Sequence, residues 1–159
     1  MQTEQIEDVK VIKPARKTRA EIMRDKVKIR LAPDTSGVLI QKILKDNDIE
    51  LPVDWTKGIY PYWLLATVEE DVVGCIQVIP AKPMGMIEFL YVSPSAPFKI
   101  RAIAAQKLVI QATSTLYHNG SEYAVSTVDA MNGKFYDIIQ KYAVKIAEAT
   151  IFLKRLKNG

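Results

Sequence analysis

MIEFLYVSP, residues 86–94, is the stretch on which the prediction of the fold depends. Residues 86–92 are apolar apart from Glu88, and such a nearly continuous apolar run is typical of a strand buried on both faces. Pro94 and Pro97 then break the extended pattern. The stretch therefore predicts a central strand of a sheet from Met86 to Val92.

The residues before this stretch predict further strands and one helix. Residues 26–31 alternate polar and apolar side chains, which indicates a half-buried strand. Residues 63–68 and 72–79 are rich in strand formers and are separated by a polar turn, so they predict an antiparallel hairpin. The remaining segments are a helix that follows the capping candidates Asp34, Thr35 and Ser36 and ends near Asn47, a loop over 49–61, and a breaker segment over 80–85.

The residues after this stretch predict alternating helices and strands. Apolar residues recur at helical spacing from Phe98 to Tyr117, which predicts the longest helix. A strand (123–128), a helix (132–142) and a last strand (144–153) follow, so the order is β–α–β–β–β–α–β–α–β. A strand–helix–strand succession favours parallel pairing through a right-handed crossover. The expected fold class is therefore α/β, with a mixed sheet covered by helices on both faces.

Length and composition favour one globular domain without metal or disulfides. The chain has 159 residues, of which 48% are hydrophobic and 25% charged. A single Cys75 forms no internal disulfide, and a single His118 cannot build a multi-histidine zinc site. No apolar run has the length of a membrane span, and the charged N-terminus lacks an apolar signal core. We therefore expect a cytoplasmic protein with no metal and no membrane contact.

Positive charge is concentrated near the N-terminus. The segment from Lys10 to Arg30 holds nine Lys and Arg against two acidic residues. We expect residues 1–25 to form a basic arm that precedes one domain over 26–159. Such an arm indicates an acidic partner, and we expect a protein held through residues 10–30 or a solvated arm without function. The segment holds no aromatic residue to stack on bases, which argues against nucleic acid.

Three stretches, taken in order, resemble the GCN5-related N-acetyltransferase superfamily across about residues 26–156. Residues 28–32 (KIRLA), followed by Asp34 and an amphipathic helix, are similar to the opening strand and helix of that family. Residues 88–94 are similar to its fourth strand and the exit from it. Residues 129–136 (DAMNGKFY) are similar to its next strand-to-helix junction. The resemblance implies the acyl-CoA N-acyltransferase fold and acetyl-CoA as cosubstrate.

The resemblance also implies where acetyl-CoA binds. In the family, backbone N–H groups after the fourth strand grip the pyrophosphate at a helix N-terminus. The first basic position of that motif is Lys99, Ala102 replaces a glycine, and Asp129 replaces an asparagine. The fourth-strand backbone near Leu90 and Val92 is expected to pair with the pantetheine arm. The implied cofactor-binding residues are Leu90, Val92, Lys99, Ile100, Arg101, Ala102, Ile103, Ala104, Asp129 and Asn132.

Two residues match the catalytic positions of the family. Glu88 stands where a carboxylate acts as general base, directly or through water. Tyr136 matches the tyrosine that protonates the departing thiolate. Two plainer interpretations remain open: Glu88 faces solvent or pairs with a lysine, and Tyr136 is a core aromatic beside Phe135.

The sequence leaves two functions open. One is an N-acetyltransferase that acts on a small amine, a protein N-terminus or a lysine. The other is a catalytically inactive protein on the same scaffold, a structural or adaptor component of a larger assembly such as a bacteriophage particle. Ala102 and Asp129 depart from the family pattern and favour the second hypothesis. Binding of acetyl-CoA would separate the two.

Overall fold

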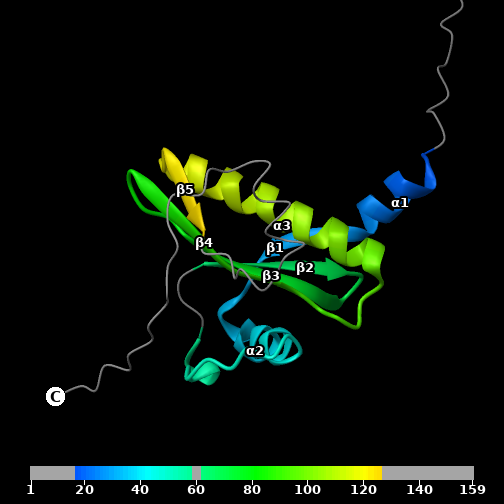
Figure 1. Cartoon of the computed structure of the whole chain (residues 1–159), viewed down its shortest axis with the longest axis horizontal. Coiled ribbons are helices and arrows are strands. Elements are labelled where there is room, and N and C mark those ends of the chain that lie inside the picture. Colours follow the sequence, from blue (N-terminus) through cyan, green and yellow to red (C-terminus); the bar gives the residue numbers. More distant parts are fainter. Residues whose placement is uncertain (1–16, 59–61, 127–159) are drawn as a thin grey trace, which may run out of the picture.

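The structure is a computed structural model that describes residues 17–58 and 62–126. Figure 1 shows the elements in these ranges. They are α1 (Arg19–Lys26), β1 (Val27–Leu31), the short 3-10 helix η1 (Asp34–Ser36), α2 (Gly37–Lys45), a second 3-10 helix η2 (Trp55–Lys57), β2 (Trp63–Val68), β3 (Asp71–Ile79), β4 (Met84–Val92), α3 (Phe98–His118) and β5 (Tyr123–Ser126).

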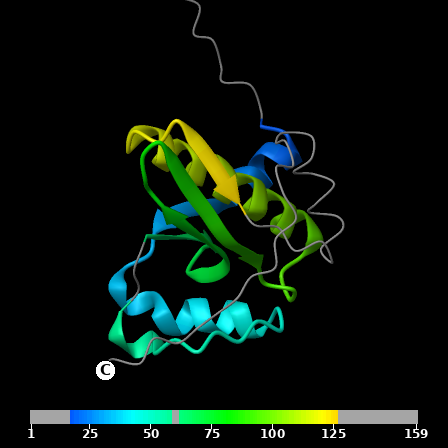
Figure 2. The same ribbon diagram turned by 60° about the vertical axis from the view of Figure 1, so that its left-hand side comes forward.

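The described strands form one mixed sheet in the order β1-β2-β3-β4-β5. The first four strands pair antiparallel, while β4 and β5 pair parallel. α3 connects the parallel pair and covers one face of the sheet, whereas α2 lies on the opposite face (Figures 1 and 2). The predicted mixed sheet with helices on both faces is therefore confirmed.

Each face of the sheet has its own apolar core. On the α3 face, Leu108 and Leu116 pack against Ile76 and Val78 of β3. On the α2 face, Ile40 and Leu44 belong to the same buried cluster as Leu65, which projects from β2. The amphipathic spacing of both helices turns one side of each toward the sheet, and burial of those side chains holds the three layers together.

Two glycines let α3 lie close to the sheet. A Cβ on Gly74 would lie 3.2 Å from Leu108 Cδ1, and one on Gly85 would lie 2.5 Å from Leu116 Cδ2. Gly85 and Leu116 thus meet where any side chain at position 85 would occupy the space of a buried leucine. The two positions fix the height of the helix above β3 and β4.

One helix was not expected from the sequence. α1 begins after Thr18, whose hydroxyl accepts from the Glu21 N–H while the Glu21 carboxylate accepts from the Thr18 N–H. This reciprocal cap satisfies two backbone donors at the helix start. α1 buries none of its residues, so no apolar periodicity marks it. Its bounds cross the expected limit between the arm (1–25) and the domain, and residues 1–16 lie outside the described ranges.

The central strand differs in burial from its prediction. β4 lies between β3 and β5, as expected of a central strand. However, Met86 is exposed and residues 88–92 are half-buried, so the prediction of burial on both faces is wrong for most of the strand.

The predicted helix over 132–142 and strand over 144–153 lie outside the described residues. Within the described ranges, none of the helices is both long enough and apolar enough to cross a membrane.

Candidate active site

A β-bulge divides β4 into two halves. Cys75 of β3 pairs with Tyr91 and Gln77 pairs with Glu88, so three steps along β4 match two steps along β3. Phe89, at the bulge, has a φ of 51°, a left-handed conformation that costs a non-glycine residue about 1–2 kcal/mol. The bulge inserts one extra residue and bends the strand at this point.

The bulge reverses which side chains face which helix. Ile87 belongs to the core under α3, and in a regular strand Phe89 would point to the same face. Instead Phe89 packs into the α2-side core, where its ring stacks on Trp63 with 6.0 Å between centroids. Leu90 and Val92 consequently pack against the α3-side core. The stacking on Trp63 contributes to holding the strained backbone in place.

Main-chain groups of the second half of β4 point away from β3. The Ser93 N–H donates to Val73 O (2.8 Å), so Ser93 faces β3. Because direction alternates along a strand, the N–H and C=O groups of Leu90 and Val92 face the β5 side. In the described residues, β5 pairs with β4 from Met84↔Tyr123 to Ile87↔Ser126, and no described strand pairs with Leu90 or Val92 on that side. The main-chain groups of Leu90 and Val92 are therefore directed so that an extended ligand could pair with them.

Asn47 closes one end of this edge. It follows α2, and its Nδ2 donates to Val92 O (3.2 Å) and to Ile43 O (2.8 Å). The Val92 carbonyl is thus already used, while its N–H remains directed toward the β5 side. Asn47 also connects the end of α2 to the end of β4, so it marks the end of the strand segment whose main-chain groups face the β5 side.

A loop of residues 93–97 leads from β4 into the first turn of α3. Pro97 precedes Phe98 and makes no side-chain cap, and the first helical bond runs from the Arg101 N–H to Pro97 O (3.0 Å). The amides of Phe98, Lys99 and Ile100 therefore have no carbonyl partner within the helix. Three such N–H groups and the positive end of the helix dipole favour an anion.

The structure divides the predicted cofactor stretch 99–104 into two parts. Lys99 and Ile100 lie in the first turn, where the amides lack helical partners. Ala102 is exposed, whereas Ile103 and Ala104 pack toward the α3-side core. By helix geometry, the N–H groups of these three residues bond to carbonyls one turn earlier. The amides without helical partners thus lie at 98–100, which overlaps the start of the predicted stretch.

Arg101 is the charged residue whose surroundings best suit contact with a ligand. Its guanidinium carbon lies 5.8 Å from the centroid of the Phe98 ring, and its Nε is buried without a hydrogen-bond partner among the described residues. A buried donor that is left unpaired costs about 1–3 kcal/mol. An acceptor group on a ligand would remove that cost. Phe98 itself is 68% exposed, so its other ring face remains accessible.

Glu88 lies at the bulge, where it is half-buried. It pairs with Gln77, which is 8% exposed, and strand alternation puts its side chain on the face opposite to Ile87. Glu88, Leu90 and Val92 thus lie on one strand, but only Leu90 and Val92 pack against the core under α3. The predicted site residues Asp129, Asn132 and Tyr136 lie outside the described residues.

Two contributors to this site were missed by the sequence reasoning. Phe89 in the left-handed region has no sequence signal, because aromatic residues rarely adopt positive φ. Asn47 could have been suspected, since an Asn at the end of a helix commonly bonds to backbone carbonyls. Its distant partner, Val92 O, depends on the tertiary fold and is not readable from the sequence.

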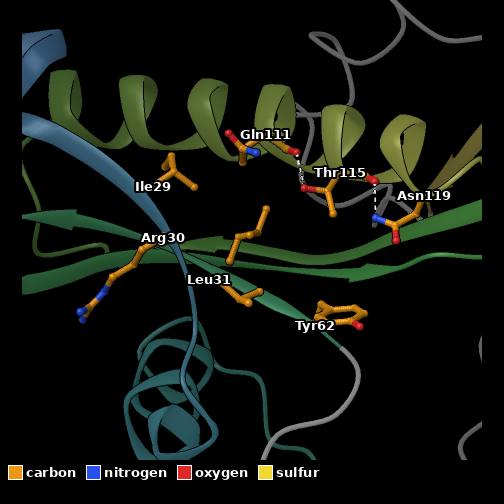
Figure 3. A pocket seen from close by; sticks show the side chains of 8 residues that line it. Ile29, Arg30, Leu31, Tyr62, Gln111, Thr115 and Asn119 are labelled. Atoms are coloured by element: carbon orange, nitrogen blue, oxygen red, sulfur yellow. Dashed lines mark hydrogen bonds between the residues drawn. The ribbon is translucent and has the colours of Figure 1, made fainter.

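Cys75, which pairs with Tyr91 across β3 and β4, is not a reactive group. Burial raises the pKa of the Cys75 thiol to about 12, which leaves it an inert part of the core. In the part of the chain that the structure describes, no group of three or more His, Cys, Asp or Glu residues could hold a metal ion. An open pocket of about 420 Å³ lies elsewhere, between β1 and α3 (Figure 3).

Comparison with known proteins supports the fold through structure alone. The sequence matches no protein-family model and no curated protein. An aminoglycoside acetyltransferase from an uncultured soil metagenomic sample has a TM-score of 0.64 at 16% identity, over 84% of this chain and 98% of that one.

Two further solved structures have different acceptors in their names. The ribosomal-protein-alanine N-acetyltransferase of Brucella melitensis biovar Abortus 2308 has a TM-score of 0.60 at 14% identity, over 82% of this chain and 99% of that one. The diaminobutyrate acetyltransferase of Paenibacillus lautus, in complex with L-2,4-diaminobutyric acid and coenzyme A, has a TM-score of 0.61 at 18% identity, over 73% and 74% of the two chains. Together with the bulged β4 that leads into α3, these similarities show that the chain has the fold of the GCN5-related N-acetyltransferase superfamily.

Proposed function

We propose that this protein is an N-acetyltransferase that transfers an acetyl group from acetyl-CoA to an amine. The observation that carries the proposal is the second half of β4, whose Leu90 and Val92 amides face away from β3 beside the uncapped start of α3. A thioester with an extended amide arm and a pyrophosphate matches both features. The similar structures named above, all acetyltransferases, support the same class.

The residues of the site fit acetyl-CoA in two respects. The pantetheine arm carries amide groups that can pair with Leu90 and Val92 like a neighbouring strand. The pyrophosphate can accept from the amides of residues 98–100, and the unpartnered Arg101 Nε offers a further charged donor nearby. Lys99 is exposed in the same turn and adds positive charge. Ala102 adds a methyl group outside these contacts, so it does not obstruct them.

Glu88 is the proposed general base. An amine must lose a proton as its nitrogen forms the new C–N bond, and a carboxylate within reach, directly or through one water, can take that proton. The C–S bond of the thioester breaks at the same stage, and the thiolate needs a proton in return. Tyr136 is the proposed donor, as a prediction outside the described residues. The thioester supplies the activated acetyl group.

The acceptor is proposed as a primary amine, without a choice between a small molecule and a protein. The relatives in fold act on an aminoglycoside, on a ribosomal protein and on diaminobutyrate, as their names state. Their common element is an amine, and the proposed general base Glu88 requires that the amine bind near it. The alternative of an inactive structural or adaptor protein predicts that acetyl-CoA does not bind at all.

Titration calorimetry with acetyl-CoA, together with a thermal-shift assay, tests the proposal. We expect saturable binding, and binding about tenfold weaker in the double variant Lys99→Glu/Arg101→Glu because both cations face the phosphates. The control variant Lys42→Glu/Lys45→Glu makes the same charge change on α2 and should bind normally. If neither heat nor a thermal shift is seen at millimolar acetyl-CoA, the enzyme proposal fails.

A further inference from the structure

β1 forms the outer edge of the described sheet, and its main chain is partly unused there. It pairs with β2 from Val27↔Val68 to Leu31↔Leu64, and within the described ranges no strand pairs with its other side. The Ala32 N–H donates to Trp63 O (2.8 Å), so the backbone of Ala32 faces β2. Alternation then directs the N–H and C=O groups of Ile29 and Leu31 outward.

Lys107 marks where this outer edge begins. Its Nζ donates to Val27 O (2.8 Å), a carbonyl that faces outward by the same alternation, and to Arg24 O (2.6 Å) at the end of α1. The usable edge therefore starts after Val27 and runs toward Leu31. Two donors and two acceptors, those of Ile29 and Leu31, are enough to register a short added strand.

An open pocket lies directly beside these groups. It has a volume of about 420 Å³ and is bounded by Ile29, Leu31 and Leu64 on the sheet side and by Gln111 and Thr115 of α3. Figure 3 shows the side chains of α3 approaching it from the helix and Leu31 from β1. Leu31 is 56% exposed, so an apolar surface stays open to solvent at the sheet edge. An added strand would place one side chain in this pocket.

The other face of β1 is positively charged. Lys28 and Arg30 are exposed there, and Figure 3 shows Arg30 pointing away from α3. The pKa of Lys107 is lowered by burial first and then by the charges of Lys28 and Arg24. The neighbouring acid, Asp25, is held in an ion pair with Lys17. The edge thus offers exposed cations on one face and, on the other, a pocket lined by the apolar Ile29, Leu31 and Leu64 together with polar residues.

We propose that the outer edge of β1 binds an extended acidic segment of another protein, as an added strand whose acidic and apolar residues alternate. The acidic side chains would lie over Lys28 and Arg30, and an apolar side chain would enter the pocket. The same charges disfavour a second copy of this chain, since two antiparallel β1 strands would bring their cations together. Residues 17–31 hold no aromatic side chain for base stacking, which favours a peptide over nucleic acid.

The probe for this proposal is the capped hexapeptide Glu-Val-Glu-Val-Glu-Val, titrated against the full chain by fluorescence anisotropy. We expect saturable binding that weakens with added salt. The reordered peptide Glu-Glu-Glu-Val-Val-Val and a peptide with alternate amides N-methylated should bind much more weakly, since one loses the alternation and the other the main-chain bonds. Equal binding of all three peptides, or tighter binding of a single-stranded oligonucleotide, overturns the proposal.

Three variants locate the site. Lys28→Glu/Arg30→Glu should weaken the acidic peptide about tenfold or more and should gain binding of Lys-Val-Lys-Val-Lys-Val. Leu31→Pro removes one outward N–H from an edge position that tolerates proline and should also weaken binding. The control Lys42→Glu/Lys45→Glu has the same net charge change on α2. If this control weakens the peptide as strongly, or if the charge swap fails to exchange peptide preference, the site is not at β1.

Discussion

The two halves of β4 differ in what they pair with, although they belong to one strand. All of Met84–Ile87 pairs with β5, and Met86 and Ile87 pair with β3 as well. Gly85 lies against Leu116, because it has no Cβ to separate them. Glu88–Val92 is paired with β3, and the described residues supply no strand on the side that Leu90 and Val92 face. The first half is a structural seam, and the second half is the segment to which we assign ligand binding in our proposal.

The bulge at Phe89 makes this division possible. One extra residue turns the side chains over, bends the strand and places Glu88 at the point where the pairing with β5 stops in the described residues. A strained backbone of this kind persists where surrounding contacts hold it, here the stacking of Phe89 on Trp63. The candidate site therefore depends on an irregularity in the sheet as much as on its side chains.

The largest expected effect concerns the seam. Leu116→Ala should lower the free energy of unfolding by about 3 kcal/mol, because a fully packed leucine leaves a cavity. Gly85→Ala should also destabilise, by about 1–3 kcal/mol, through the clash with Leu116 Cδ2. In the double variant the new methyl group enters the cavity, so the free energy of unfolding should fall by less than the sum of the two single losses. Additive losses in urea denaturation would show that the two positions do not meet.

The second effect concerns the second half of β4. Glu88→Gln should reduce acetyl transfer to a responsive amine about 100-fold, with acetyl-CoA affinity unchanged, because the variant lacks a proton acceptor. Turnover is measured by release of the CoA thiol across a panel of primary amines. Adding Gln77→Glu to the Glu88→Gln variant moves the carboxylate to the paired position on β3 and tests whether it restores turnover there. Unaltered turnover in Glu88→Gln would remove Glu88 from the mechanism.

The third effect tests the core beneath the second half. Burial raises the pKa of Cys75 to about 12 from 9.0, so the folded state keeps the proton while the unfolded state loses it between these values. Stability should therefore fall as pH rises above about 9, by at most about 1.4 kcal/mol per pH unit from this group. Cys75→Ala should show a shallower decline between pH 9 and 11. Identical slopes in urea denaturation would mean that the thiol is not buried as described.

The smallest effect tests the bulge itself. Since φ at position 89 is positive, Phe89→Gly should be more stable than Phe89→Ala by about 1 kcal/mol, although both lose the stacking on Trp63. At the exposed Met86 in the first half, the order should reverse, because glycine in a regular strand is the worse residue. Thermal unfolding of the four variants decides the matter. The same order at both positions would contradict a bulge at Phe89.

Much of the fold could be predicted, because apolar periodicity reports which side of an element is buried. The predicted strands over 63–68 and 72–79 and the helix from Phe98 to Tyr117 agree closely with β2, β3 and α3. α1 was not predicted because it has no buried face, although Thr18 and Glu21 form a capping pair that indicates a helix start. A helix that buries no side chain leaves no apolar periodicity in the sequence by which it could be predicted.

The elements that carry the candidate site could be predicted, but the local geometry could not. Glu88, Leu90 and Val92 lie on the strand that the sequence predicts, and α3 begins at Phe98 as predicted; their role in binding and catalysis stays a prediction. The bulge was hidden, because residues 89–92 are all apolar and a reversal of faces leaves no polar residue out of place. The amides without helical partners are those of residues 98–100, because α3 begins at Phe98, one residue before the stretch 99–104 that the resemblance marks.

Amide hydrogen exchange of the full chain, followed residue by residue with and without acetyl-CoA, tests the division of β4. We predict that the ligand slows exchange at Leu90, Val92 and the amides of residues 98–100, while exchange at Met86 and Ile87 stays unchanged because both residues are already paired with β3 and β5. Protection of both halves alike, or no protection at Leu90 and Val92 under saturating ligand, would contradict the division of β4 on which the proposed chemistry rests.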